Sequence, residues 1–226
     1  MGLTTTGQWV GAHPAAMLAF LAAGYLIGSI PFGVIIGAAH KVDLRKVGSG
    51  NVGATNVGRV LGRKWGYLCF FLDMGKGLAA VLLAAALLGA DEGVPSHLAQ
   101  AVQLGVGCAA IAGHVFNVWL RFKGGKGVAT SLGVVLGIYP YFTYAGLVAL
   151  ALWIVVAVGT RYVSLGSVVA AIAFVPLVAV FNWGRLTDRW PTGVFAVVMV
   201  AIILVRHRSN IRRLLNGTEN KIGKKG

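Results

Sequence analysis

Charged residues are scarce in this chain of 226 residues: they make up 12%, and only 6 of them are acidic. A soluble domain carries about 25% charged residues to wet its surface, so a soluble globular protein is excluded. Disorder is excluded as well, because 57% of the residues are hydrophobic. The two cysteines, Cys69 and Cys108, both lie in apolar runs, which excludes a disulfide scaffold. The composition therefore predicts an all-α polytopic membrane protein with a single domain over residues 1–226.

Basic residues, by contrast, are plentiful, and 20 Lys and Arg give a formal net charge of +14. In a soluble protein this excess would suggest nucleic acid as a partner. In a membrane protein it indicates the cytoplasmic bias of basic residues, together with an anionic substrate. No Lys or Arg precedes Lys41, so the basic region of a signal peptide is missing and the first apolar run is predicted to be a retained helix.

The apolar runs predict seven membrane-spanning helices, each of which needs roughly 20 apolar residues. The run from Gly127 to Gly159 is too long for one comfortable span and contains Pro140, so we predict two spans there, one of them short. The predicted spans are 15–38, 65–89, 101–120, the two within 127–159, 163–181 and 192–205.

The basic residues give this arrangement an orientation. With the N-terminus outside, all of the 20 Lys and Arg residues except Arg185 and Arg189 fall on the cytoplasmic side. Merging the two spans around Pro140 would divide the basic residues between both sides. We therefore predict an N-terminus outside and a cytoplasmic C-terminus.

Residues 43–64, DLRKVGSGNVGATNVGRVLGRK, form a polar and glycine-rich segment. Glycine lets the backbone adopt positive φ, and successive amides in such a turn bind an anion. A predicted helix follows, whose N-terminus adds positive potential. The alternative is a flexible loop, but Arg45, Lys46 and Arg59 favour an anion site. Besides Ser49 and Arg59, the candidate binding residues are Gly48, Gly50, Asn51, Gly53, Thr55 and Asn56.

The segment 122–131, FKGGKGVATS, has the components of a second phosphate-binding loop: glycines, lysines, hydroxyls and a helix that begins directly afterwards. It is not a Walker A motif, because Gly127 is followed by Val128 rather than Lys and no strand precedes it. A basic turn between two helices is the alternative. The candidate binding residues are Lys123, Gly124, Gly125, Lys126 and Gly127.

Three pairs of polar residues lie three positions apart, on one helical face each. His207 and Asn210 can hold a hydroxyl group and orient an anion, although a solvated basic tail is the alternative. His114 and Asn117 lie near the end of the third predicted span, where a histidine is often only a packing residue. Asp73 and Lys76 lie within an apolar run, which favours a structural ion pair.

Five segments closely resemble the bacterial acyl-phosphate:glycerol-3-phosphate acyltransferases, the PlsY family, and the resemblance covers nearly the whole chain. They are GSIPFG (28–33), DLRKVGSGNVGATNVGRVLG (43–62), GHVFNVWLRFKGGKGVAT (113–130), TRYVSLGS (160–167) and RHRSNIRRLLNGTENKIG (206–223). Many members of the family have Pro where this chain has Asn117. The resemblance implies a seven-helix protein of the bacterial inner membrane, with its N-terminus outside and its active site on the cytoplasmic face.

The resemblance also implies the reaction: an acyl group passes from acyl phosphate to the 1-hydroxyl of glycerol-3-phosphate, giving lysophosphatidic acid and phosphate in the first acylation of phospholipid synthesis. Residues 123–127 match the loop that the family uses for glycerol-3-phosphate, and Glu219 matches a structural Glu. The implied catalytic residues are Ser49, Arg59, His207 and Asn210.

The chemistry adds further expectations. An acyl phosphate is already activated, and Ser49 has no adjacent base in the sequence, so we predict direct transfer without an acyl-enzyme. The general base is left open between His207 and the substrate's own phosphate. The scattered acids predict no metal site, and we expect no cofactor. The expected partners are the two substrates and the lipid bilayer, from which the fatty chain enters between helices; neither nucleic acid nor an obligate protein partner is expected.

Two other enzyme classes and a transporter are the alternatives to this prediction. Acyltransferases of the H-x-x-x-x-D type are excluded, because none of the 5 histidines has Asp five positions later. A metal-dependent phosphatidyl-alcohol transferase would need clustered aspartates. A transporter would be expected to show internal repeats and polar residues near the middle of the membrane, whereas the polar segments here lie at one interface.

Overall fold

The computed structural model describes residues 14–89, 96–184 and 190–222, and all regular structure in these ranges is helical, which confirms the predicted all-α class. The helices are α2 (Pro14–Gly28), α3 (Phe32–Ala39), α4 (Ala54–Leu61), α5 (Arg63–Gly89), α6 (Ser96–Val115), the 3₁₀ helix η1 (Val118–Leu120), α7 (Val128–Gly137), α8 (Thr143–Thr160), α9 (Val163–Phe181), α10 (Trp190–Arg206) and α11 (Arg208–Leu215).

Five segments among the described residues are long and apolar enough to cross a membrane, and the count rises to six if α10 and α11, which meet at 59°, form one broken span. Two predicted spans are missing from the five: α10, whose 17 residues reach span length only together with α11, and α7. The 10 residues of α7 give a length of about 15 Å, half the thickness of the hydrocarbon core. Seven spans therefore stay a prediction, and so does the orientation of the chain in the membrane.

Prolines divide two of the predicted runs. Pro140 lies between the end of α7 and the start of α8, which confirms the predicted break. The predicted first span, 15–38, is also divided: α2 ends at Gly28 and α3 begins at Phe32, directly after Pro31. Proline lacks an N–H and pushes the preceding residue towards an extended conformation, which explains why the helix does not continue.

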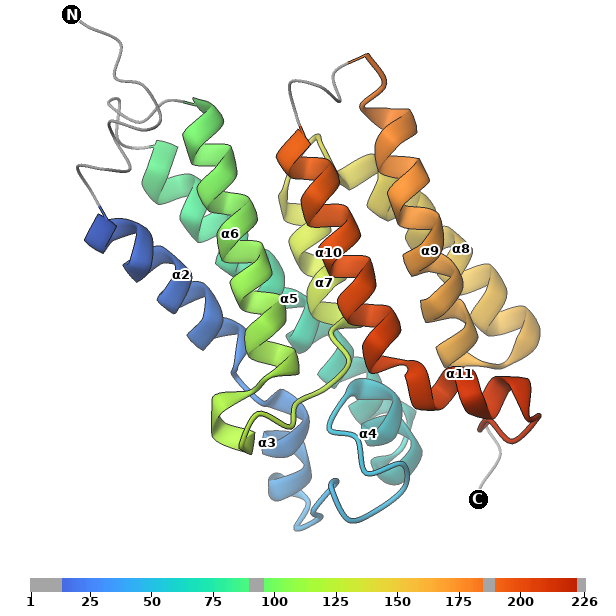
Figure 1. Cartoon of the computed structure of the whole chain (residues 1–226). Coiled ribbons are helices and arrows are strands. Elements are labelled where there is room, and N and C mark those ends of the chain that lie inside the picture. The colour runs from blue at the N-terminus through green and yellow to red at the C-terminus, as the bar shows by residue number, and fades with distance from the viewer. Residues whose placement is uncertain (1–13, 90–95, 185–189, 223–226) are drawn as a thin grey trace, which may run out of the picture.

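The long helices lie side by side, and the short helices α3, α4, η1 and α11 gather at one end of the bundle, the lower end in Figure 1. We call this the loop end; it contains residues 29–64, 116–127, 160–163 and 206–222. Most of these residues are predicted on one side of the membrane, but residues 29–38 and 116–120 are predicted within spans. Figure 1 also shows the chain turning back from η1 into the body of the molecule before α7 begins. Arg185 and Arg189, predicted on the opposite side, lie outside the described residues.

Small residues let the long helices of the bundle approach one another closely. A Cβ on Gly28 of α2 would collide with the backbone of Ala110 in α6. Gly77 of α5 likewise lies against the backbone of Thr130 in α7, and Gly133 of α7 lies against Met74 of α5. Such contacts are typical of helix packing in membranes. They fix α2 against α6 and α5 against α7, and therefore also the polar groups at the ends of these helices.

Candidate active site

A pocket of about 120 Å³ opens at the loop end, several times larger than the space of one water molecule. Its walls come from the loop before α4 and from α4 itself, from α5 to α9, and from the segment after α10. Eleven of the residues predicted for the site line it: Ser49, Asn51, Gly53, Thr55, Asn56, Arg59, Lys126, Gly127, His207, Asn210 and Glu219. Gly48, Gly50, Lys123, Gly124 and Gly125 are not among its lining residues.

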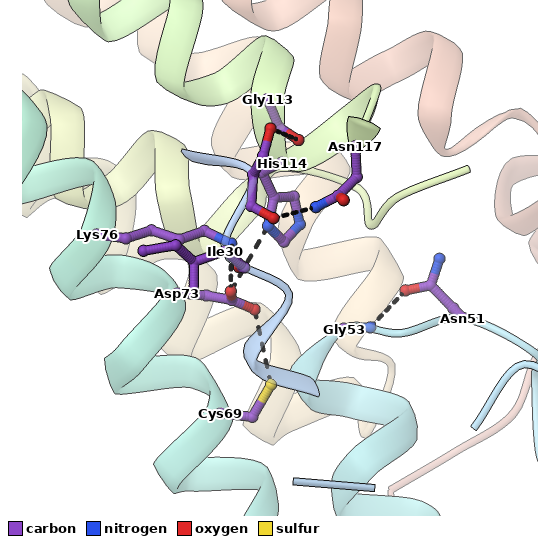
Figure 2. Close-up of polar contacts among 10 residues, drawn as sticks. Ile30, Asn51, Gly53, Cys69, Asp73, Lys76, Gly113, His114 and Asn117 are labelled. Carbon is purple, nitrogen blue, oxygen red and sulfur yellow. Dashed lines mark hydrogen bonds and ion pairs between the residues drawn. The ribbon is translucent and has the colours of Figure 1, made fainter. Parts of the chain in front are cut away.

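The loop before α4 is organised by two asparagine side chains. Asn56 is buried; its Oδ1 accepts a hydrogen bond from the amide of Ser49 at 2.8 Å, and its Nδ2 donates to the carbonyl oxygens of Leu44 and Val47, each at 3.1 Å. Asn51 Oδ1 accepts from the amide of Gly53 at 2.9 Å (Figure 2). The sequence predicts these loop amides as anion donors, but the amides of Ser49, Gly50 and Gly53 already have acceptors within the protein.

Gly48 and Gly50 shape this loop rather than line the pocket. Their φ angles are 62° and 69°, in the left-handed region that favours glycine. At Gly48 a Cβ would also collide with Oδ1 of Asn56. Both glycines are therefore needed for the conformation that presents Ser49, whose side chain is exposed.

The free donors of the pocket lie at two helix N-termini. Gly53 is the N-cap of α4 and Gly127 is the N-cap of α7, and neither helix start has a side-chain capping bond. The first turns of both helices line the pocket. The first amides of a helix have no intrahelical acceptor and carry a partial positive charge, so each N-terminus is suited to bind an anion.

The glycine-rich loop before α7 is held by backbone contacts. The amides of Gly124 and Gly125 donate to the carbonyl oxygens of Val115 and His114, at 3.0 and 3.1 Å. Arg206 of α10 donates to the carbonyl oxygens of the same two glycines, at 3.1 and 3.3 Å. Both amides are thus used within the protein, in contrast to the predicted phosphate cradle.

The two lysines of this loop occupy different places. Lys123 is exposed and lies outside the pocket lining, whereas Lys126 lines the pocket and its Nζ donates to Oδ1 of Asn210 at 2.6 Å. Burial lowers the pKa of Lys126 to about 8, and the carboxylate of Glu219 opposes this shift. The protonated Lys126 is therefore a partly desolvated cation, which binds an anion more strongly than a hydrated surface lysine.

Glu219 connects the segment after α11 to the pocket. Its Oε1 accepts from Asn210 Nδ2 at 2.8 Å and from Ser164 Oγ at 3.1 Å, and its Oε2 accepts from Arg213 Nε at 2.7 Å. The chain of hydrogen bonds from Lys126 through Asn210 and Glu219 to Ser164 therefore joins three segments that are distant in the sequence: the loop before α7, the segment after α10 and the start of α9.

His207 lines the same pocket and is 2% exposed. Its Nδ1 lies 2.8 Å from the carbonyl oxygen of Ile203. A carbonyl oxygen only accepts, so Nδ1 carries a proton, and in the neutral ring Nε2 is then an acceptor.

Sequence reasoning did not assign Asp73 or His114 to the site, although both line the pocket. The predicted ion pair between Asp73 and Lys76 is confirmed at 2.7 Å, with both side chains buried. Asn117 does not act with His114: its Oδ1 accepts from the amide of Trp119 and its Nδ2 donates to the carbonyl oxygen of Ser29. The sequence signal that could have assigned Asp73 and His114 to the site is the presence of ionisable residues within apolar runs, which usually marks a functional site in a membrane protein.

One wall of the pocket is aromatic. Phe70 of α5 and Trp153 of α8 line the pocket with their ring centroids 6.5 Å apart and their planes inclined by 22°. The indole N–H of Trp153 donates to Ser167 Oγ at 3.1 Å, which fixes the ring. The pocket therefore has a cationic side suited to phosphate and an apolar side suited to a hydrocarbon chain. No group of three or more His, Cys, Asp or Glu suited to a metal ion occurs in the described part of the chain.

Comparisons with known proteins agree with this chemistry. A family model described as glycerol-3-phosphate acyltransferase matches residues 18–217. A protein from Brucella canis with that name is 45% identical over 218 residues, covering 96% of this chain and 98% of the relative. A namesake from Geobacter sulfurreducens is 46% identical over 205 residues, covering 90% of this chain and 96% of the relative.

Two solved structures are also similar. Both are of PlsY, described as an integral membrane glycerol 3-phosphate acyltransferase. The glycerol 3-phosphate form superposes with a TM-score of 0.79 at 41% identity, and the lysophosphatidic acid form with 0.77 at 40%. Each comparison covers 92% of this chain and 96% of the solved chain.

Proposed function

The chain belongs to the glycerol-3-phosphate acyltransferase family and is an integral membrane acyltransferase of phospholipid synthesis, and we propose that it moves an acyl group from acyl phosphate to the 1-hydroxyl of glycerol-3-phosphate. The products are lysophosphatidic acid and inorganic phosphate. The observation that carries this proposal is the pair of uncapped helix N-termini, those of α4 and α7, at one pocket with an aromatic wall. Two phosphate groups and one hydrocarbon chain are what this reaction brings together.

We assign the phosphate of glycerol-3-phosphate to the N-terminus of α7 and Lys126. The Nζ of Lys126 is held by Asn210 at 2.6 Å, and its partial desolvation strengthens its attraction to a dianion. Lys123 is exposed and outside the pocket, so we do not give it this role. His207 and Asn210, from the same side of the pocket, orient the glycerol part.

We assign the acyl phosphate to the N-terminus of α4, with Ser49 and Arg59. The unused amides at the start of α4 and the Arg59 guanidinium are the donors available there. Phe70 and Trp153 offer an apolar surface to the fatty chain, which enters from the bilayer between helices.

The transfer is direct. The glycerol hydroxyl oxygen attacks the carbonyl carbon, the bond between that carbon and the phosphate oxygen breaks, and inorganic phosphate leaves. The hydroxyl proton passes to the departing phosphate or to Nε2 of His207. Donors that face the developing negative charge lower the barrier most, and Arg59 and the α4 amides are suited to this. No acyl-enzyme is required, because the donor is already a mixed anhydride.

We place the reaction at the cytoplasmic face of a bacterial inner membrane. The loop end holds the polar segments and most of the basic residues, and the positive-inside rule assigns such an end to the cytoplasm. A water-soluble acceptor and a membrane-borne donor meet at such an interface.

The test is a donor comparison on the purified protein. Acyl phosphate, acyl-CoA and acyl-carrier protein are supplied separately with glycerol-3-phosphate in the presence of EDTA, and lysophosphatidic acid is measured. We expect turnover with acyl phosphate alone, with one inorganic phosphate released per product. Turnover with a thioester donor, trapping of an acylated protein, or a requirement for added magnesium would contradict the proposal.

A further inference from the structure

Three buried polar side chains form a cluster at the wall of the pocket, which Asp73 and His114 line, and the reaction described above uses none of the three. Figure 2 shows Asp73 of α5 between Lys76 of the same helix and His114 of α6. The Asp73 carboxylate lies 2.7 Å from Lys76 Nζ and 3.6 Å from His114 Nδ1. The three residues are 3%, 5% and 7% exposed. Buried ionisable groups are costly in a membrane protein, so a group of three calls for a function.

The position of Asp73 is fixed from two sides. Lys76 Nζ also donates to the carbonyl oxygen of Ile30, in the break between α2 and α3, at 2.8 Å. Cys69 Sγ donates to the other carboxylate oxygen of Asp73 at 3.6 Å. The carboxylate therefore has little freedom to rotate, and it faces Nδ1 of His114 as an orienting anion. Carboxylate groups orient imidazole rings in this way in many sites.

The opposite edge of the His114 ring lies against the glycine-rich loop. A Cβ added to Gly125 would collide with Nε2 of His114, and all three of its nearest atoms belong to that ring. The carbonyl oxygen of His114 also accepts from the amide of Gly125 at 3.1 Å. His114 thus supports Gly125 with its backbone and its side chain, while Arg206 holds the loop through the glycine carbonyl oxygens.

We propose that His114, oriented by Asp73, is a positioning residue that holds Gly125 at a fixed depth and thereby aims Lys126 at the phosphate of the acceptor. Lys126 directly follows Gly125, so a shift of this glycine moves the start of the lysine side chain. The role of His114 is mechanical support and does not require contact with the reacting atoms. The inference rests on the proposed assignment of Lys126 to glycerol-3-phosphate.

This arrangement predicts a separation of kinetic constants. Without the imidazole ring the loop can sink into the vacated space, and Lys126 is displaced from the acceptor phosphate. We expect His114→Ala to raise the KM for glycerol-3-phosphate about tenfold, a loss typical of a displaced positioning group. The kcat and the KM for the acyl donor change much less, because the residues proposed to bind the donor phosphate lie at the start of α4.

A double-mutant cycle tests the contact itself. Gly125→Ala is made alone and in the His114→Ala background, where the ring that its Cβ would strike is absent. The matched control is Gly124→Ala, because its Cβ would strike the carbonyl oxygen of His114, which remains when the side chain is removed. Thermal unfolding of each variant in detergent accompanies the kinetics, and His114→Ser serves as a second way to remove the ring.

We expect the acceptor KM of the Gly125 double variant to equal that of His114→Ala alone, whereas the effects of Gly124→Ala and His114→Ala multiply. Asp73→Asn is expected to raise the acceptor KM in the wild-type background and to have little effect without His114. Multiplying effects for the Gly125 pair, or an unchanged KM in His114→Ala, would overturn the proposal. The double-mutant cycle compares KM values for glycerol-3-phosphate and can be measured with any acyl donor that supports turnover. Its result can therefore be interpreted even if acyl phosphate fails as the donor.

Discussion

At Asn210 a single amide group connects a cation and an anion of the pocket. Its Oδ1 accepts from Lys126 and its Nδ2 donates to Glu219. A side-chain amide accepts through its oxygen and donates through its nitrogen without adding charge. The partly buried ammonium and the carboxylate thus stay separate, which leaves Lys126 available to the ligand anion proposed above instead of being neutralised by Glu219.

Ser49 and Arg59 are expected to matter for turnover and not for folding. Ser49 is exposed and Arg59 is partly buried, and both line the pocket. We expect Ser49→Ala and Arg59→Ala each to lower kcat by about 10²-fold, as the loss of a donor to a developing charge does. Turnover and the melting temperature of the purified variants are measured together. Wild-type turnover in either variant would remove that residue from the proposed mechanism.

Acceptor binding is expected to depend on pH through Lys126. Burial lowers the pKa of this lysine to about 8, so in the unliganded protein the cation is lost as the pH rises past that value. The acceptor phosphate is already a dianion there, since the second pKa of a phosphate monoester is about 6. We therefore expect the KM for glycerol-3-phosphate to rise above pH 8 in steady-state kinetics.

Lys126→Arg is the control for this pH dependence, because a guanidinium stays charged throughout the range. Its KM is expected to be higher than that of the wild type at neutral pH, since the shape of the cation differs, but to change little across the same pH range. An equally steep rise in this variant would assign the titration to another group.

At the scale of the elements, the site depends on how α4 and α7 begin. Both start at a glycine N-cap without a side-chain cap, and Gly127 has φ of 87°. A capping Ser or Asp would satisfy the first amides and close the anion site. With glycine at the N-cap these two helix starts give up only a few tenths of a kcal/mol each, and their first amides stay available to the proposed ligands.

Gly127→Ala tests this arrangement. An alanine in the left-handed region costs about 1–2 kcal/mol, and its Cβ would approach Val115 to 3.1 Å. We expect a raised KM for glycerol-3-phosphate together with a lower melting temperature. Gly75→Ala is the matched control, because Gly75 lies within α5 with open space around its added Cβ. That variant should keep its activity and unfold at the same or a higher temperature.

The segment after α11 is expected to contribute mainly to stability through Glu219. Glu219→Gln keeps the size of the side chain but leaves Arg213 without its charged partner and weakens the bonds from Asn210 and Ser164. A cost of about 1–3 kcal/mol is typical for such a loss. Thermal unfolding in detergent measures it. An unchanged melting temperature would show that this segment does not brace the pocket.

The sequence predicts where the helices begin and end better than it predicts which side chains face the pocket. The break at Pro140 and the start of α7 after Gly127 follow from proline and glycine chemistry, which is local. The break after Gly28 was missed, although Pro31 signals it. The side-chain acceptor in Asn51-Val52-Gly53 was also missed, although asparagine commonly bonds the amide two residues on.

At the scale of the whole molecule, the residues that line the pocket are spread along the chain from Ser49 to Asn220. The distribution of basic residues in the sequence already predicts that the polar segments lie on one side of the membrane. Rotation of a helix about its axis could not be predicted in this way. The spans are apolar all round, so no stripe showed that Asp73, His114 and Trp153 face the same space. Their placement depends on close contacts such as that between Gly77 and Thr130, which involve residues distant in the sequence.

Labelling with a membrane-impermeant maleimide tests the orientation. In a background without Cys69 and Cys108, single cysteines replace the exposed residues Lys46, Lys123 and Tyr139. We expect the first two to react in inverted vesicles and Tyr139, near the far end of α7, to react in intact cells. Reaction of Lys46→Cys and Lys123→Cys on opposite faces would contradict a shared pocket, and reaction of both in intact cells would reverse the orientation.

The chain of hydrogen bonds that joins Lys126, Asn210 and Glu219 also has a consequence for biosynthesis. Ribosomes make the chain from its N-terminus, so a nascent polypeptide that has emerged only as far as Arg206 has inserted its long helices but lacks His207, Asn210 and Glu219. Such an intermediate has no assembled pocket. If His207 and Asn210 have the roles proposed above, premature stop codons or stalled translation in this stretch would leave protein that is embedded in the membrane but inactive.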